Sequence, residues 1–210
     1  VVHSGVDTDK FIFGKTKLHQ EYRLPKETFL VGNVSALADH KDLFTFIDTA
    51  EIILQQAQHI HFFLIGDGSE MNALKTRVTE KKLTANIHFT GFRNDVNELL
   101  PELNLFLMTS KTEGLGTTIL DAFAAKVPVV ATNAGGIPEI VRHEQTGLIA
   151  PIGNAQQLAK LVLEVMNDSN LANTLATNAQ QLVADFTFRR TAEKTKAVYT
   201  QVLQEENQKV

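Results

Sequence analysis

The sequence predicts an α/β fold in which a parallel β-sheet is flanked by helices. From Glu27 onward, short apolar runs typical of strands alternate with segments of helical periodicity, which is the pattern of βαβ units. The chain has 210 residues, of which 43% are hydrophobic, so it can bury the core that such a sheet requires. The predicted strands lie at residues 28–31, 61–65, 87–89, 103–108 and 128–131.

Helices are predicted between these strands and after the last of them. In the first helix, apolar residues recur every three or four positions and form one face that can cover the sheet. Beyond Ile149 the pattern is entirely helical. The predicted helices lie at residues 41–57, 70–82, 95–100, 117–125, 155–166, 171–184 and 190–204.

A polar, Lys-rich stretch at residues 15–26 precedes the first strand and is typical of a linker. It ends in Leu24, Pro25 and Lys26, so a domain boundary is predicted near residue 26. The first residue is Val rather than Met, from which we expect the sequence to be a fragment of a longer chain.

Composition argues against several classes of protein. Twenty Lys and Arg residues against 24 Asp and Glu residues give a net charge of -4, without the basic excess that binding to nucleic acid requires. The chain has no Cys, so disulfides and zinc–thiolate sites are excluded. His59 and His61 alternate along one predicted strand instead of standing four apart on a helix, and no metal site is expected.

Nothing in the sequence predicts a membrane span or a secretory signal. No apolar run approaches the roughly 18 residues that cross a bilayer, and the N-terminal residues lack the pattern of a signal peptide. We therefore expect a soluble, cytoplasmic protein.

A polar loop at residues 109–116 follows the fourth predicted strand, at the sheet edge where parallel sheets bind ligands. It contains Gly114 and Gly116, and the helix after it begins at Thr117 and Thr118. The first N–H groups of a helix have no intrahelical acceptor and lie at the positive end of its dipole, so this helix start suits a phosphate group. An ordinary helix start with a glycine turn would have the same sequence.

Two acidic residues flank this loop and helix. Glu113 stands before the helix and Asp121 one turn inside it, so both can face one crevice and hold different parts of a ligand. Asp121 can also stabilise the helix simply by its charge near the N-terminus, at roughly 0.3–1 kcal/mol.

Four segments carry a more specific pattern, and together they resemble the donor-binding signature of glycosyltransferase family 4. They are residues 110–116, 120–124, 127–132 and 135–141, which read SKTEGLG, LDAFA, VPVVAT and GGIPEIV. The resemblance extends over nearly the whole chain, through residues 3–7, residues 31–33 with Lys41, residues 66–68, and Gly91 with Phe92.

The resemblance implies a retaining enzyme of the GT-B architecture, in which two Rossmann-like domains face each other across a cleft. This chain would be its C-terminal, nucleotide-sugar-binding half: residues 1–26 as interdomain joint and linker, 27–186 as the donor-binding domain and 187–210 as a C-terminal helix. The partner of the site would be a nucleoside diphosphate sugar, with no further cofactor and no metal ion. The N-terminal acceptor-binding half would be missing, so we expect the fragment alone to be inactive.

The resemblance also implies roles for the acidic and basic residues. Glu113 matches the catalytic acid that faces the donor sugar near its anomeric centre. Asp121 matches the acid that holds the ribose hydroxyls, although the family usually has the longer Glu there. Lys41 matches the residue that contacts the diphosphate, and Asn33 stands where the family often has Arg. Lys111 is either a replacement for that missing charge or a solvated surface residue.

The remaining donor-binding residues lie in loops. Gly114, Leu115, Gly116, Thr117 and Thr118 form the predicted phosphate-binding turn.

Two further loops complete the implied site. Gly91, Phe92 and Arg93 match the loop that edges the nucleotide base, with a core position as the alternative for Phe92. Gly66 and Gly68 match a turn that lets the backbone approach a ligand closely, although a tight strand-to-helix turn would look identical.

The sequence leaves other functions open. A sugar phosphorylase or a nucleotide-sugar epimerase could share the architecture, and so could a non-catalytic nucleotide-binding domain. A hydride-transferring enzyme is disfavoured because residues 66–68 lack the third Gly of the dinucleotide fingerprint. The resemblance also allows peripheral association of the full-length enzyme with the inner face of a membrane.

Overall fold

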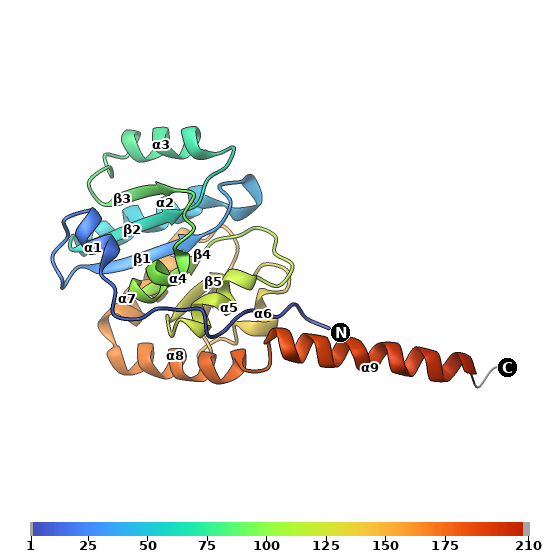
Figure 1. The fold of residues 1–210 in the computed structure, drawn as a ribbon. Coiled ribbons are helices and arrows are strands. Elements are labelled where there is room, and N and C mark those ends of the chain that lie inside the picture. Colours follow the sequence, from blue (N-terminus) through green and yellow to red (C-terminus); the bar gives the residue numbers. More distant parts are fainter. Residues whose placement is uncertain (1, 208–210) are drawn as a thin grey trace.

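The computed structural model describes residues 2–207 and shows one parallel sheet between two layers of helices (Figure 1). Its six strands have the order β3-β2-β1-β4-β5-β6, and all pairs are parallel. The strands are β1 (Phe29–Val34), β2 (Ile60–Ile65), β3 (Ile87–Gly91), β4 (Leu105–Met108), β5 (Val129–Thr132) and β6 (Leu148–Ala150).

The helices lie between these strands and after the last one. They are α1 (Lys17–Glu21), α2 (Leu43–Leu54), α3 (Met71–Glu80), α4 (Val96–Leu99), α5 (Thr117–Ala124), α6 (Ile137–Ile140), α7 (Ala155–Asn167), α8 (Ser169–Val183) and α9 (Phe188–Asn207), with short 3-10 turns η1 (Asp39–Lys41) and η2 (Leu100–Glu102).

Strand residues alternate between two buried clusters, one on each face of the sheet. In β2, for example, Phe63 and Ile65 join one cluster while Phe62 and Leu64 join the other. Helices α2, α3 and α7 cover the second face, and α4 and α5 cover the first together with α1. The apolar runs of the sequence are therefore continuous because both faces are buried.

The predicted α/β class is confirmed, and each predicted strand and helix overlaps an observed one. The helix predicted at 41–57 begins only at Leu43, because Asp42 has a left-handed backbone (φ +48°) that separates η1 from α2. Strand β6 is missing from the prediction, since three residues are too few to show a pattern. Helix α8 begins two residues before its predicted start, where the Asp168 carboxylate accepts the N–H groups of Asn170 and Leu171.

The stretch predicted as a linker contains α1 and packs on the domain, which is a correction to that prediction. Leu18 is fully buried in the same core cluster as the sheet. The carboxylate of Glu102 accepts the N–H groups of Leu18 and His19 at 2.9 Å each, which satisfies two free donors of the helix. Local composition could not reveal this, because Glu102 is distant in the sequence.

The N-terminal segment and the start of α9 lie side by side. Val6 forms a parallel bridge with Thr187, and its N–H donates to the Phe186 carbonyl at 2.8 Å. Helix α9 then projects away from the body of the domain (Figure 1). The predicted joint begins at residue 1, and the predicted C-terminal helix ends at residue 210. Residue 1 and residues 208–210 lie outside the described part of the chain. Within residues 2–207, no helix is long and apolar enough to cross a membrane.

Two histidines meet on the sheet beneath α1. His61 Nδ1 lies 2.8 Å from His88 Nε2, and the His88 ring also packs against Tyr22 and Phe63. One ring must donate to the other, so the contact requires that at least one of them is neutral. Burial lowers the pKa of His61, and burial followed by the charge of His61 lowers the pKa of His88 to about 4.

This pair should make the fold less stable in acid. An unfolded histidine takes up its proton near pH 6.5, whereas His88 in the folded chain does so only at about 4. The stability that depends on the neutral ring is thus complete above roughly pH 6.5 and is lost as the pH falls towards 4. We expect His88→Phe to reduce the fall in the free energy of unfolding between about pH 7.5 and about pH 4.5, measured by urea denaturation.

The matched control is His59→Gln, which replaces an exposed histidine just before β2. This variant should show the native pH dependence. An equal fall in the free energy of unfolding for His88→Phe and for the native chain would show that His88 does not cause the loss of stability in acid.

Candidate functional site

A cavity of about 360 Å³ lies at the carboxyl edge of the sheet. Its walls come from the ends of three neighbouring strands, β1, β2 and β3, and from the starts of α4 and α5. It lies beside the point between β1 and β4 where the strand order reverses, which is where sheets of this kind bind ligands. The lining residues are Val34–Ala36, Ile65–Asp67, Phe92, Arg93, Val96 and Thr118.

Gly66, which follows β2, allows the chain there to approach the end of β1 closely. Its φ of +144° is one that residues with a side chain rarely adopt, and a Cβ there would lie 1.9 Å from the Ser35 carbonyl oxygen. Its N–H donates to the Gly91 carbonyl at 3.0 Å, which links the ends of β2 and β3. Gly68 is similarly confined, since its Cβ would lie 2.4 Å from the Leu37 oxygen.

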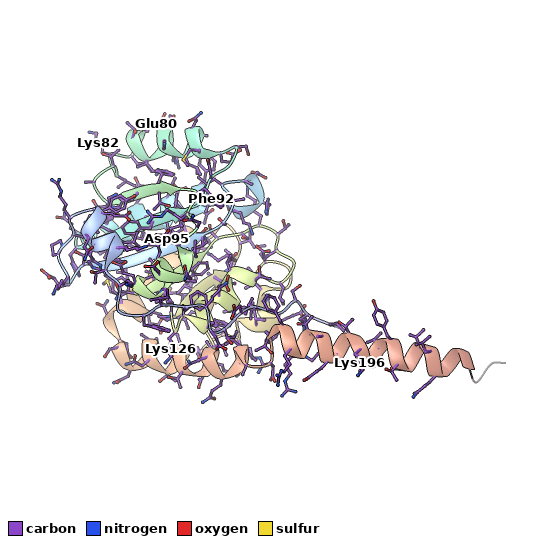
Figure 2. The ribbon with its side chains drawn as sticks, viewed as in Figure 1. Glu80, Lys82, Phe92, Asp95, Lys126 and Lys196 are labelled. Carbon is purple, nitrogen blue, oxygen red and sulfur yellow. The ribbon has the colours of Figure 1, made fainter. Side chains whose placement is uncertain are left out.

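Phe92 stands on the rim of the cavity with 79% of its surface exposed, so the alternative of a core position is wrong. Figure 2 shows it on the connection between β3 and α4, above Asp95.

Arg93, in the wall of the cavity, is held by two carboxylates. Its guanidinium donates to both oxygens of Asp95 at 2.8 Å each and to both oxygens of Glu21 at 2.7 and 2.9 Å. These hydrogen bonds lower the pKa values of both carboxyl groups. Arg93 therefore anchors the β3–α4 loop to α1, and its charge is already compensated.

The loop at residues 109–116 is fastened by backbone contacts to its neighbours. The Lys111 N–H donates to the His40 carbonyl at 2.8 Å, and the Gly136 N–H donates to the Glu113 carbonyl at 3.0 Å. The Thr132 hydroxyl donates to the Ser110 carbonyl at 2.7 Å. Gly116 then begins α5 with a φ of +79°.

Lys41 and Glu113 meet in front of this loop. The Lys41 ammonium lies 2.5 Å from Glu113 Oε2, and their side chains are only 15% and 16% exposed. The Ser110 hydroxyl lies 3.4 Å from the same carboxylate oxygen. The Thr109 hydroxyl donates to the Lys41 carbonyl at 3.0 Å and ties the two segments together. The residues predicted for the diphosphate and for catalysis are therefore direct neighbours.

Asp121 also has a basic partner. It lies on α5, one turn after Thr118, and its Oδ1 is 2.7 Å from the ammonium of Lys10. Burial raises the pKa of Asp121, and the contact with Lys10 opposes that rise.

The side chains of Asn33 and Lys111 both bind neighbouring groups of the protein. The Asn33 amide is buried in the sheet, donates to the Leu107 carbonyl at 2.8 Å and accepts the Ser35 hydroxyl at 2.6 Å. Lys111 lies 3.1 Å from Asp39 and is paired at the surface. The structure thus gives neither residue the free charge that a missing Arg would have supplied.

The structure brings four of the predicted residues together in the cavity: Gly66, Phe92, Arg93 and Thr118. The other predicted residues lie outside its lining: Asn33, Lys41, Gly68, Gly91, Glu113, Gly114, Leu115, Gly116, Thr117 and Asp121. Sequence reasoning missed the lining residues Val34–Ala36, Ile65 and Val96. Their position at or just after the ends of predicted elements was the available signal.

The family model for glycosyl transferases group 1 matches residues 14–182. The chain belongs to this family. A similar relative is the amylovoran biosynthesis glycosyltransferase AmsK of Erwinia amylovora, 30% identical over 174 residues, which are 79% of this chain and 41% of AmsK. The chain spans about half the length of the curated relatives it matches.

Two solved structures resemble the fold closely. Anabaena HepE, crystallised with UDP and glucose, has a TM-score of 0.87 and 27% identity over 95% of this chain and 56% of its own. The C-terminal domain of the group 1 protein LpcC from Francisella tularensis has a TM-score of 0.77 and 27% identity over 88% of this chain and 100% of its own. These likenesses confirm the predicted Rossmann-like fold class of GT-B glycosyltransferases.

The site depends on a close backbone approach at Gly136, which gives a direct prediction. A Cβ at Gly136 would lie 1.9 Å from the Gly114 carbonyl oxygen, although the backbone angles of Gly136 (φ -82°) suit any residue. Gly136→Ala should therefore cost about 1–3 kcal/mol of unfolding free energy, as overpacking typically does.

The control is Gly114→Ala, where a Cβ would have no heavy atom within 4 Å. This variant should stay within roughly 0.5 kcal/mol of the native chain. Urea denaturation of both variants measures the loss of unfolding free energy. Similar losses in the two variants would show that the close approach of Gly136 to the Gly114 carbonyl does not hold the loop.

Proposed function

We propose that this chain is the donor-binding domain of a retaining glycosyltransferase of family 4, which transfers a sugar from a nucleoside diphosphate sugar to an acceptor. The observation that carries the proposal is the ion pair of Lys41 and Glu113 in front of the start of α5, the helix whose Thr118 lines the cavity at the carboxyl edge of the sheet. The UDP bound by the structural neighbour HepE supports a nucleotide ligand. In the longer protein, residues 27–186 would hold the donor and another domain the acceptor.

The cavity suits the nucleoside end of such a ligand. Several of its walls are apolar, from Val34, Ile65 and Val96, and the exposed ring of Phe92 stands at its rim. Its volume of about 360 Å³ lies within the range of small-molecule pockets. A flat base can pack on these walls while the backbone around Gly91 supplies polar contacts.

The α5 start and Lys41 suit the diphosphate. The N–H groups of Thr117 and Thr118 are in the first turn and lack intrahelical acceptors, and Lys41 adds a positive charge. In the structure that charge is balanced by Glu113. An incoming diphosphate would share the ammonium, and Lys41 would then stabilise the negative charge of the departing diphosphate.

Glu113 would then face the sugar. Its carboxylate is held by Lys41, and its backbone is held by Gly136, so it is fixed in place before a ligand arrives. A fixed negative charge near the anomeric carbon favours the positive charge that develops there as the bond to the diphosphate breaks.

The binding step is tested on the native chain and on Lys41→Ala. UDP, GDP and ADP are compared by calorimetry, and at least one should bind. Lys41→Ala should weaken its binding by about 1.5–3 kcal/mol, the range for hydrogen bonds to charged groups, which is roughly ten- to a hundred-fold in Kd. Binding of the corresponding nucleoside should hardly change.

Lys111→Ala is the matched control, since Lys111 lies on the adjacent loop and pairs with Asp39. It should bind the diphosphate like the native chain. Equal losses for nucleoside and diphosphate in Lys41→Ala would show that Lys41 does not contact phosphate, and no binding by any of the three nucleotides would refute the proposed function.

Glu113→Gln tests the catalytic role in the full-length enzyme. We expect kcat to fall at least about 100-fold, because a charge that acts mainly in the transition state is lost. Affinity for the nucleoside diphosphate should stay the same or rise, since Lys41 loses its competing partner. An unchanged kcat would return Glu113 to a structural role.

A further inference from the structure

The ion pair of Lys10 and Asp121 joins the N-terminal segment to the helix at the candidate site. The two charged groups are 2.7 Å apart. Asp121 Oδ1 is a buried atom, while the side chain as a whole is 20% exposed. Part of the Asp121 side chain is therefore accessible beside the oxygen that faces Lys10.

The backbone around Lys10 is fixed by contacts with α4. The Asn97 side chain donates to the Lys10 carbonyl at 3.3 Å, and the Ile12 N–H donates to the Asn97 carbonyl at 2.9 Å. Phe11, the next residue, is buried in the core cluster. The ammonium of Lys10 also lies 5.1 Å from the centre of the Phe11 ring, a distance at which the ring attracts a cation. Lys10 is thus held in place independently of Asp121.

Lys10 favours the charged form of Asp121, which is the better hydrogen-bond acceptor. Its burial and the nearby charge of Asp7 both raise its pKa, and Lys10 is the group that lowers it. A carboxylate has about four acceptor positions, whereas its protonated form offers fewer and adds a donor. With Lys10 occupying Oδ1, the positions that remain can accept two neighbouring hydroxyl groups.

We propose that Lys10 is a positioning residue, which fixes the carboxylate of Asp121 so that its open side accepts the hydroxyl groups of a ribose. This inference rests on the proposed function, because the ribose belongs to the nucleoside diphosphate. Lys10 itself makes no contact with the ligand. It sets the selectivity of the site for a vicinal diol from a segment outside the predicted donor-binding domain.

The experiment measures selectivity for the diol. The best-binding nucleotide among UDP, GDP and ADP is compared by calorimetry with its 2′-deoxy and 3′-deoxy forms. The native chain should prefer the full ribose by roughly ten-fold or more, as expected for a hydrogen bond to a charged acceptor. Asp121→Ala should lose the preference, and Lys10→Met should reduce it at least several-fold.

Two further variants separate positioning from a merely structural effect. Lys10→Arg keeps the positive charge and should restore most of the preference. Lys126→Met is the matched control. The ammonium of Lys126 contacts the N-terminal segment at a different place, 5.6 Å from the centre of the Phe13 ring, so this variant should keep the native preference for the full ribose. Thermal melts of all variants show whether each is folded.

The outcomes distinguish the two proposals. If no nucleotide binds the native chain, the proposed function and this inference both fall. If Asp121→Ala loses the preference while Lys10→Met keeps it, only the role of Lys10 is overturned. If Asp121→Ala keeps the preference, Asp121 does not hold the ribose and Lys10 has nothing to position.

Discussion

The loops at the carboxyl edge of the sheet come so close to one another that only glycine fits between them. Gly66 faces the Ser35 carbonyl, Gly135 faces the Glu113 carbonyl and Gly136 faces the Gly114 carbonyl, with virtual Cβ distances of 1.9–2.0 Å. The contacts of Gly135 and Gly136 fix the turn before α5. The position of Glu113 follows from this backbone packing, and the chemistry that we propose depends on it.

Charge pairing is the second constraint on the site. Lys41 pairs with Glu113, Lys10 with Asp121, and Arg93 with Glu21 and Asp95. Each pair has at least one mostly buried member, and removing the partner of that member would leave an uncompensated charge in a poorly solvated place. A charged ligand must therefore compete with the existing side-chain partners. The free energy of binding is the difference between the side-chain pairs before binding and the contacts with the ligand after it.

The sequence predicted most of the fold because both faces of the sheet are buried. The resulting apolar runs are strong signals, whereas the three residues of β6 and the five of α1 are too short to give one. In the site, the glycines and the Lys41 and Glu113 positions could be predicted from motifs. The clamp on Arg93 and the partner of Asp121 could not, since both depend on residues about 70 or more positions away in the sequence.

The N-terminal segment supports the site on two sides. Glu21 holds Arg93 in the cavity wall, and Lys10 holds Asp121 on α5. Both contacts cross the boundary predicted at residue 26, and the burial of Val6, Phe11 and Leu18 in the domain core secures the segment that makes them. Because Arg93 and Asp121 lie on different elements, a shift of this one segment would act on both ends of the nucleotide site that we propose. The segment that the resemblance implies to be joint and linker is therefore part of the framework on which the proposed nucleotide selectivity would depend.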